Sequence, residues 1–108
     1  MASGILGSAD LSQNTDTSVY TVPASTYSVV TVSVCNRNAS QSANVRIAVA
    51  TSGTPGAADY LEYQVSLGAN GVLERTGIVA QAARQVIVRS DQASVTAVVM
   101  GIETAVPA

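Results

Sequence analysis

The sequence predicts an all-β protein, an antiparallel β-sandwich of about seven to eight short strands in a single domain. Three observations favour this fold. Apolar and polar residues alternate along several segments, turn-forming residues separate these segments, and no segment has helical periodicity. The length of 108 residues fits one hydrophobic core and no more. The strand order, immunoglobulin-like or jelly-roll-like, stays open at this stage.

The most regular strand is predicted at residues 27–35, where valines alternate with Thr31 and Ser33. The same alternation recurs at residues 45–49 and 60–65. Less regular strands are predicted at about residues 17–22, 72–79, 84–89 and 93–102. Turn-forming residues lie between the strands, at 36–42, 52–56, 68–71 and 90–92. The chain is therefore predicted to consist of strands and turns almost throughout.

Three segments lack the strand pattern. Residues 79–84 have helical propensity, but the run is too short for a stable helix, so we predict a turn there. Residues 1–11 and 104–108 contain Gly, Ser, Ala and Pro without alternation. They are predicted to be an N-terminal arm and a C-terminal tail, which flank a β-sandwich domain of residues 12–103 and become ordered only on docking to a neighbour.

The composition excludes most catalytic chemistry. The chain has no histidine, and charged residues make up 11% of it, against about 25% in an average soluble domain. Because general acid–base catalysis at neutral pH most often uses histidine, we expect neither an enzyme nor a cofactor. The net charge of -2 argues against nucleic acid and anionic membranes as partners. The single cysteine, Cys35, can form no internal disulfide and is expected to be a small buried thiol.

Two other groups of side chains are candidate sites. Asp59, Glu62 and Asp91 offer the oxygen ligands that Ca²⁺ prefers, but their spacing matches no calcium loop. A solvated acidic rim is expected instead, and no metal site is predicted. A platform for sugar rings would need tyrosines on one face of a sheet. Alternation separates Tyr60 from Tyr63, so the sequence argues against a shared platform.

The hydrophobic core is expected to be thin, because valine is the main apolar residue and Phe and Trp are absent. A thin core leaves a narrow margin of stability unless further surface is buried between chains. We therefore expect a homo-oligomer, a trimer or a dimer. Lysine, a usual guard against unwanted strand pairing, is missing from every possible edge strand, so edge pairing is also open.

The last predicted strand supplies a candidate interface. Both of its faces are largely apolar, and one of them carries Val98, Met100 and Ile102. Since an antiparallel sandwich usually has one solvated face, this face indicates contact with another subunit, or else cover by a loop of the same chain. Glu74 and Arg75 point to opposite faces of an extended strand, so one of them is expected to be buried or at an interface. Arg75 is expected to pair with a carboxylate, either across an interface or within one chain.

Several short runs resemble the small virion proteins of tailed bacteriophages, over about residues 20–103. These runs are Ala58-Asp59-Tyr60-Leu61-Glu62-Tyr63, Asn70-Gly71-Val72-Leu73-Glu74-Arg75-Thr76-Gly77, Val88-Arg89-Ser90-Asp91 and Gly101-Ile102-Glu103. The resemblance implies an all-β protein that is present in many copies and attached to capsids or tails as a cement, decoration or related part. The runs consist of strand and turn residues, and no functional residue carries over.

The expected function is that of a capsid cement or decoration protein, on the capsid surface of a virion assembled in the bacterial cytoplasm. Its expected partners are the major capsid protein or other virion proteins. Repeated docking on a lattice would then combine many weak contacts. A tail, neck or fibre-base component is an alternative with the same composition. A carbohydrate-binding module is a more distant alternative.

Overall fold

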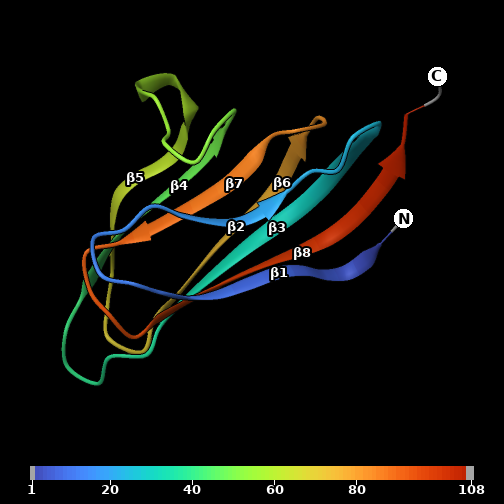
Figure 1. The fold of residues 1–108 in the computed structure, drawn as a ribbon. Helices are drawn as coiled ribbons and strands as arrows, with labels where there is room; N and C mark the ends of the chain where they lie inside the picture. The colour runs from blue at the N-terminus through green and yellow to red at the C-terminus, as the bar shows by residue number, and fades with distance from the viewer. Residues whose placement is uncertain (1, 107–108) are drawn as a thin grey trace.

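The computed structural model describes residues 2–106, and its regular secondary structure is β-strand apart from one short 3-10 helix (Figure 1). The elements found in this part of the chain are β1 (Ser3–Leu11), β2 (Thr17–Thr21), β3 (Thr26–Asn36), β4 (Ala43–Ala50), the short 3-10 helix η1 (Ala57–Asp59), β5 (Tyr60–Leu67), β6 (Val72–Ala80), β7 (Gln85–Ser90) and β8 (Val95–Ala105). The predicted all-β class and the predicted strands are confirmed. None of the described residues form a helix with the length and apolar character needed to cross a membrane.

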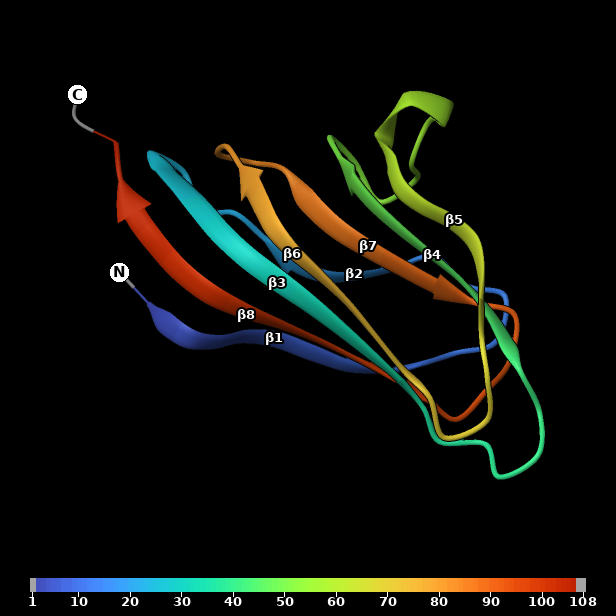
Figure 2. The same cartoon turned by 180° about the vertical axis from the view of Figure 1, so that it is seen from behind.

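The strands form two antiparallel four-stranded sheets, which Figures 1 and 2 show as two layers from opposite sides. Sheet I has the order β1-β8-β3-β6, and sheet II has the order β2-β7-β4-β5. The pairing is nested, because β1 pairs with β8, β2 with β7, β3 with β6, and β4 with β5. Such nesting arises when one long hairpin folds across two layers, which is the jelly-roll arrangement. The strand order is therefore that of a jelly roll and not that of an immunoglobulin-like sandwich.

The core lies between the two sheets and consists mainly of valine. The face of β3 with Val30, Val32 and Val34 is buried, and so are Val45 and Ile47 of β4, as their alternation predicts. Apart from Tyr20, which is also buried, the core has no large ring. Each buried valine contributes about 1.5–2 kcal/mol, so many small contributions replace a few large ones.

The predicted N-terminal arm is wrong, because residues 3–11 form β1 and pair with β8 along their whole length. Leu11 is 2% exposed and belongs to the core. At Gly7 the backbone lies so close to β2 that an added Cβ would be 2.1 Å from the carbonyl oxygen of Val19. The partner strand supplies the hydrogen bonds that fix β1, so this strand needs little apolar alternation of its own.

The predicted C-terminal tail is wrong at its start. Thr104 and Ala105 belong to β8 and pair with Tyr27 and Thr26 of β3. Backbone pairing with β3 is again the reason, because the ladder continues where the apolar pattern ends. The last part of the predicted tail, residues 107–108, lies outside the described residues.

All four edge strands carry β-bulges. The extra residues are Leu6 in β1, Val19 in β2, Leu61 and one of the pair Tyr63–Gln64 in β5, and one of the pair Thr76–Gly77 in β6. Bulges twist an edge and interrupt its row of free backbone groups, which discourages pairing with another strand. The chain has no lysine to discourage pairing at its edge strands, but every edge strand has a β-bulge, which has the same effect. The faces of the sheets are therefore better suited to association than the edges.

Candidate functional site

Part of the outer face of sheet I is apolar, and this part has members on all four strands. In the register of the sheet, Val79 of β6 lies opposite Val29 of β3, and Val29 lies opposite Ile102 of β8. In the next row, Met100 of β8 lies opposite Ile5 of β1. Opposite residues in an antiparallel pair share a face, so these side chains form one continuous surface. We call it the apolar face; its members are Ile5, Val29, Val79, Val98, Met100 and Ile102.

The apolar face is accessible, and none of its six members is charged; the exposed Glu74 of β6 lies at its border, opposite Ser33 in the row of Val98. Val79 is 67% exposed, Ile5 64% and Ile102 52%, which are high values for side chains of this size. Val98 and Met100, two of the predicted interface residues, are half-buried beside them. No loop of residues 2–106 covers the exposed members. Exposed apolar side chains that adjoin one another, rather than scattered ones, are typical of interaction surfaces.

Glu74 and Arg75 are both exposed in β6, so neither of them is buried within the chain. The reason is that β6 is an edge strand, and the sandwich is open beside it. The expectation that one of them lies at an interface stays a prediction. Arg75 lies opposite Val32, on the inner side of sheet I, and donates to Glu62 Oε2 of sheet II across 3.0 Å. Arg75 and Glu62 therefore form an ion pair within one chain, which was one of the two alternatives. This ion pair links the two sheets at their open side.

A small pocket opens at the same side of the sandwich. It has a volume of about 200 Å³ and is lined by Val49, Leu61, Arg75, Thr76, Gly77, Ile78 and Val79. Val79 also belongs to the apolar face, so the pocket and this face adjoin. The volume suits one apolar side chain better than a cofactor, since pockets for small molecules have about 300–1,000 Å³. The pocket therefore extends the apolar face as an anchor point.

A second group of side chains lies on the outer face of sheet II, and it contradicts the predicted separation of Tyr60 and Tyr63. The two rings contact edge to face, with centroids 4.9 Å apart and planes at 80°. The Arg46 guanidinium lies 4.5 Å from the centroid of the Tyr63 ring, and its Nε donates to Gln64 Oε1 across 2.7 Å. The bulges in β5 are the cause, because each extra residue shifts the alternation by one position. We call Arg46, Tyr60, Tyr63 and Gln64 the tyrosine–arginine cluster.

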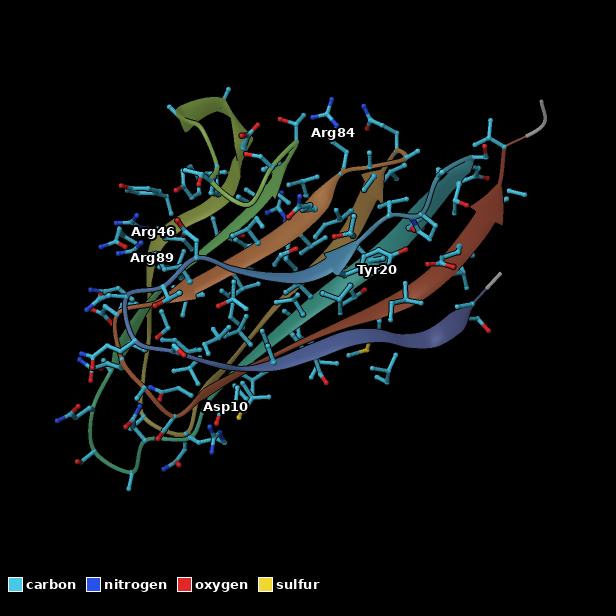
Figure 3. The ribbon with its side chains drawn as sticks, viewed as in Figure 1. Asp10, Tyr20, Arg46, Arg84 and Arg89 are labelled. Carbon is cyan, nitrogen blue, oxygen red and sulfur yellow. The ribbon has the colours of Figure 1, made fainter. Side chains whose placement is uncertain are left out.

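A polar network joins the sheets inside the sandwich, at the end where the termini lie (Figure 3). The Tyr20 hydroxyl of β2 donates to Glu103 Oε2 of β8 across 2.6 Å and lies 2.6 Å from Ser28 Oγ of β3. Burial, together with the bond to Glu103, raises the pKa of Tyr20 from 10.0 to about 12. The bond from Tyr20 holds the pKa of Glu103 below its ordinary value. Because its members are far apart in the chain, sequence reasoning missed this network.

The structure separates the three carboxylates considered for Ca²⁺. Asp59 accepts from the Gly56 backbone N–H at 2.8 Å, Glu62 pairs with Arg75, and Asp91 accepts from Asn44. Each therefore has a structural partner in a different region. No group of three His, Cys, Asp or Glu side chains within residues 2–106 is placed to hold a metal ion.

Cys35 is half-buried on the outer side of β3 rather than buried as predicted. Its neighbours in the register are Val72 and Thr96. The strand alternation explains the position, because Val34 occupies the inner face and the next residue must face outward. No histidine exists in the chain to act as a base for the thiol.

Compared with protein families, with curated proteins and with solved structures, the chain gives no match. Functional inference therefore depends on the sequence, the jelly roll and its two outer faces.

Proposed function

We propose that this chain is a virion structural protein, a cement or decoration protein that binds the head lattice of a tailed bacteriophage as a homo-oligomer. The single observation that carries the proposal is the apolar face of sheet I, a set of adjoining apolar side chains with members on all four strands. The sequence resemblance to small phage virion proteins agrees with this role. So does an inventory of side chains without histidine, since binding a lattice requires no catalysis.

The apolar face is suited to lasting contact with other virion proteins. Removing apolar surface from water contributes about 25 cal/mol per Å², and it does so without the geometric demands of charged pairs. The adjoining pocket lined by Leu61 and Ile78 would receive one apolar side chain of the major capsid protein. Contacts that are weak for one copy become strong when an oligomer docks at several lattice positions at once.

The bulged edges support face-to-face docking over strand pairing. A cement protein is present at high local concentration on a capsid, so free edges would promote uncontrolled association. Interruption of every edge strand removes this hazard, while the apolar face stays available. The jelly roll can then dock in one defined orientation.

The test uses heads of the phage that encodes this chain, prepared without it, together with the purified protein. Ile102→Glu and Val79→Glu each place a carboxylate in the apolar face at an exposed position, so folding should be preserved. We expect wild-type protein to bind the heads and each variant to bind at least about tenfold more weakly. Ser18→Glu is the matched control, because Ser18 is an exposed strand residue of sheet II.

The solution mass of the free protein belongs to the same experiment. A dimer or trimer that rebinds heads supports the proposal. A species that binds tails or forms rings, and ignores heads, would replace it with the tail, neck or fibre-base alternative. Equal head binding by wild type and both variants would show that the apolar face is not the docking surface.

A further inference from the structure

The tyrosine–arginine cluster on the outer face of sheet II is a second surface that head docking does not use. Its Arg46 is held in place from two sides, by the Tyr63 ring at 4.5 Å and by Gln64 Oε1 at 2.7 Å. None of the carboxylates within residues 2–106 lies within salt-bridge distance of Arg46. The guanidinium is therefore oriented but not neutralised, and its terminal N–H groups remain as donors.

A second guanidinium lies directly beside the first. Arg89 of β7 is the register partner of Arg46 of β4, and both lie at the same end of sheet II (Figure 3). Arg89 forms an ion pair with Asp16 across 3.7 Å, which is looser than a hydrogen-bonded pair. Like charges opposite each other on neighbouring strands destabilise a sheet. Asp16 offsets the charge of Arg89, and an anionic ligand would offset that of Arg46.

The aromatic part of the cluster indicates that the ligand contains a sugar ring. Tyr63 is 57% exposed even though it contacts Tyr60 and Arg46, so much of its ring remains available. Sugar rings stack on exposed aromatic rings, and their hydroxyl groups take hydrogen bonds from amides. Gln64 is exposed, and its amide nitrogen remains as a donor because its oxygen accepts from Arg46.

We propose that the tyrosine–arginine cluster binds an acidic saccharide. The sugar ring stacks on Tyr63, and its carboxylate accepts hydrogen bonds from Arg46. An acidic peptide segment is the competing ligand. The structure favours the saccharide, because the exposed part of the cluster is one ring with polar neighbours, and the pocket that would hold an apolar side chain lies at a different place.

The experiment is an NMR titration of the full chain with trigalacturonate as the acidic probe, maltotriose as the neutral saccharide and triglutamate as the acidic peptide. We expect trigalacturonate to shift the resonances of Tyr63 and Arg46 and to saturate with a dissociation constant of about 1 mM. Maltotriose and triglutamate should each bind at least about tenfold more weakly, because each lacks one of the two recognised features.

Two pairs of variants separate the site from general effects. Tyr63→Ala and Arg46→Gln should each weaken trigalacturonate binding at least about tenfold. Tyr27→Ala removes another exposed tyrosine, and Arg84→Gln another arginine without a carboxylate partner in residues 2–106, so both should bind like wild type. The spectra of the free variants report whether each one is folded.

Three outcomes would overturn the proposal: no shifts at about 10 mM trigalacturonate, unchanged binding by Tyr63→Ala, or binding of triglutamate as tight as that of trigalacturonate. The last outcome would assign the cluster to an acidic protein partner. Failure here is distinguishable from failure of head docking, because Val79→Glu alters sheet I and should leave trigalacturonate binding unchanged.

Discussion

Tyr20 shows how single residues fasten the two layers of this thin sandwich. Its hydroxyl has one proton, which it donates to Glu103, so Ser28 must donate its own proton to Tyr20. Ser28 is fully buried, and its only side-chain bond within the described residues is this one. The three residues come from β2, β3 and β8, and the network therefore connects sheet II to two strands of sheet I.

Tyr20→Phe removes the hydroxyl and leaves Ser28 without its partner, so we expect the free energy of unfolding to fall by about 1–2 kcal/mol near neutral pH. The loss should depend on pH. The pKa of Tyr20 is raised from 10.0 to about 12, so the wild-type advantage is complete below pH 10 and is lost as the pH rises to about 12. The pKa of Glu103 is lowered, so the advantage also fades as the pH falls below 4.5 and through the folded value.

Urea unfolding of wild type and Tyr20→Phe across this pH range measures the difference directly. Tyr27→Phe serves as the control, because Tyr27 is exposed on the outer face of β3 and its hydroxyl makes no bond within the described residues. A constant difference between wild type and Tyr20→Phe from pH 8 to pH 12 would contradict the assigned hydrogen bond to Glu103.

Asn36 is the second residue whose role depends on hydrogen bonding rather than on size. It is fully buried, and its Nδ2 lies 2.9 Å from the Gln41 carbonyl oxygen, 3.1 Å from that of Leu67 and 3.2 Å from that of Gly68. Its Oδ1 accepts from the backbone and the side chain of Asn38. Asn36 therefore ties the end of β3 to the following loop and to the turn between β5 and β6.

Asn36→Asp keeps the shape but replaces the amide donor with a carboxylate that faces three carbonyl oxygens. We expect a loss of about 3 kcal/mol or more in the free energy of unfolding, measured by urea or thermal denaturation at neutral pH. Asn14→Asp makes the same chemical change at an exposed turn residue and should stay within about 0.5 kcal/mol of wild type. Equal stability of Asn36→Asp and wild type would exclude the donor role.

At the scale of the elements, sequence predicts a strand well where one face is buried and the alternation is unbroken. The residues of β3 satisfy both conditions, and the prediction there agrees with the structure within one residue at each end. In β5, the bulges at Leu61 and at Tyr63–Gln64 break the period, so the sequence separated two tyrosines that the structure brings together. The positive φ of 55° at Gln64 shows the local distortion. Because β5 contains no glycine, the sequence gives no sign of a bulge there.

β1 was missed for a different reason. Its residues carry little apolar pattern, and its conformation is imposed by pairing with β8, a strand that lies about 90 residues later in the chain. Local propensity contains no information on such a partner. The same limit applies to the strand order, because the alternation of β3 and β8 is equally compatible with an immunoglobulin-like sandwich. The apolar face was partly predictable, since Val98, Met100 and Ile102 already share one side of an extended strand.

Gly7→Ala tests whether β1 is an integral strand. An added methyl group would lie 2.1 Å from the Val19 carbonyl oxygen, so the backbones of β1 and β2 would have to move apart. We expect a loss of about 2–3 kcal/mol in the free energy of unfolding. Gly53→Ala is the matched control, because an added Cβ there meets nothing within 4 Å. If both variants were as stable as wild type, β1 would be a loosely attached arm, as the sequence predicted.

At the scale of the whole molecule, the two long sides of the sandwich differ. On one side β1 and β2 approach closely at Gly7 and close the core. On the other side β5 and β6 are linked by the Arg75–Glu62 pair, next to the pocket. The two outer faces differ as well, since sheet I presents apolar side chains and sheet II presents tyrosine and arginine. A particle with two unlike faces can bind a lattice with one of them and keep the other free for a second ligand.

The response of binding to salt tests which forces would hold the molecule on a phage head under the proposed function. If the apolar face is the docking surface, a rise in sodium sulfate from about 0.05 M to about 0.5 M should leave the affinity unchanged or tighten it, because sulfate strengthens apolar burial while it screens charges. Arg75→Gln should then bind heads within about twofold of wild type, since Arg75 already pairs with Glu62 in its own chain. Weakening of at least about tenfold by salt and by Arg75→Gln together would instead show that Arg75 pairs across the interface, and the apolar face would lose its assigned role.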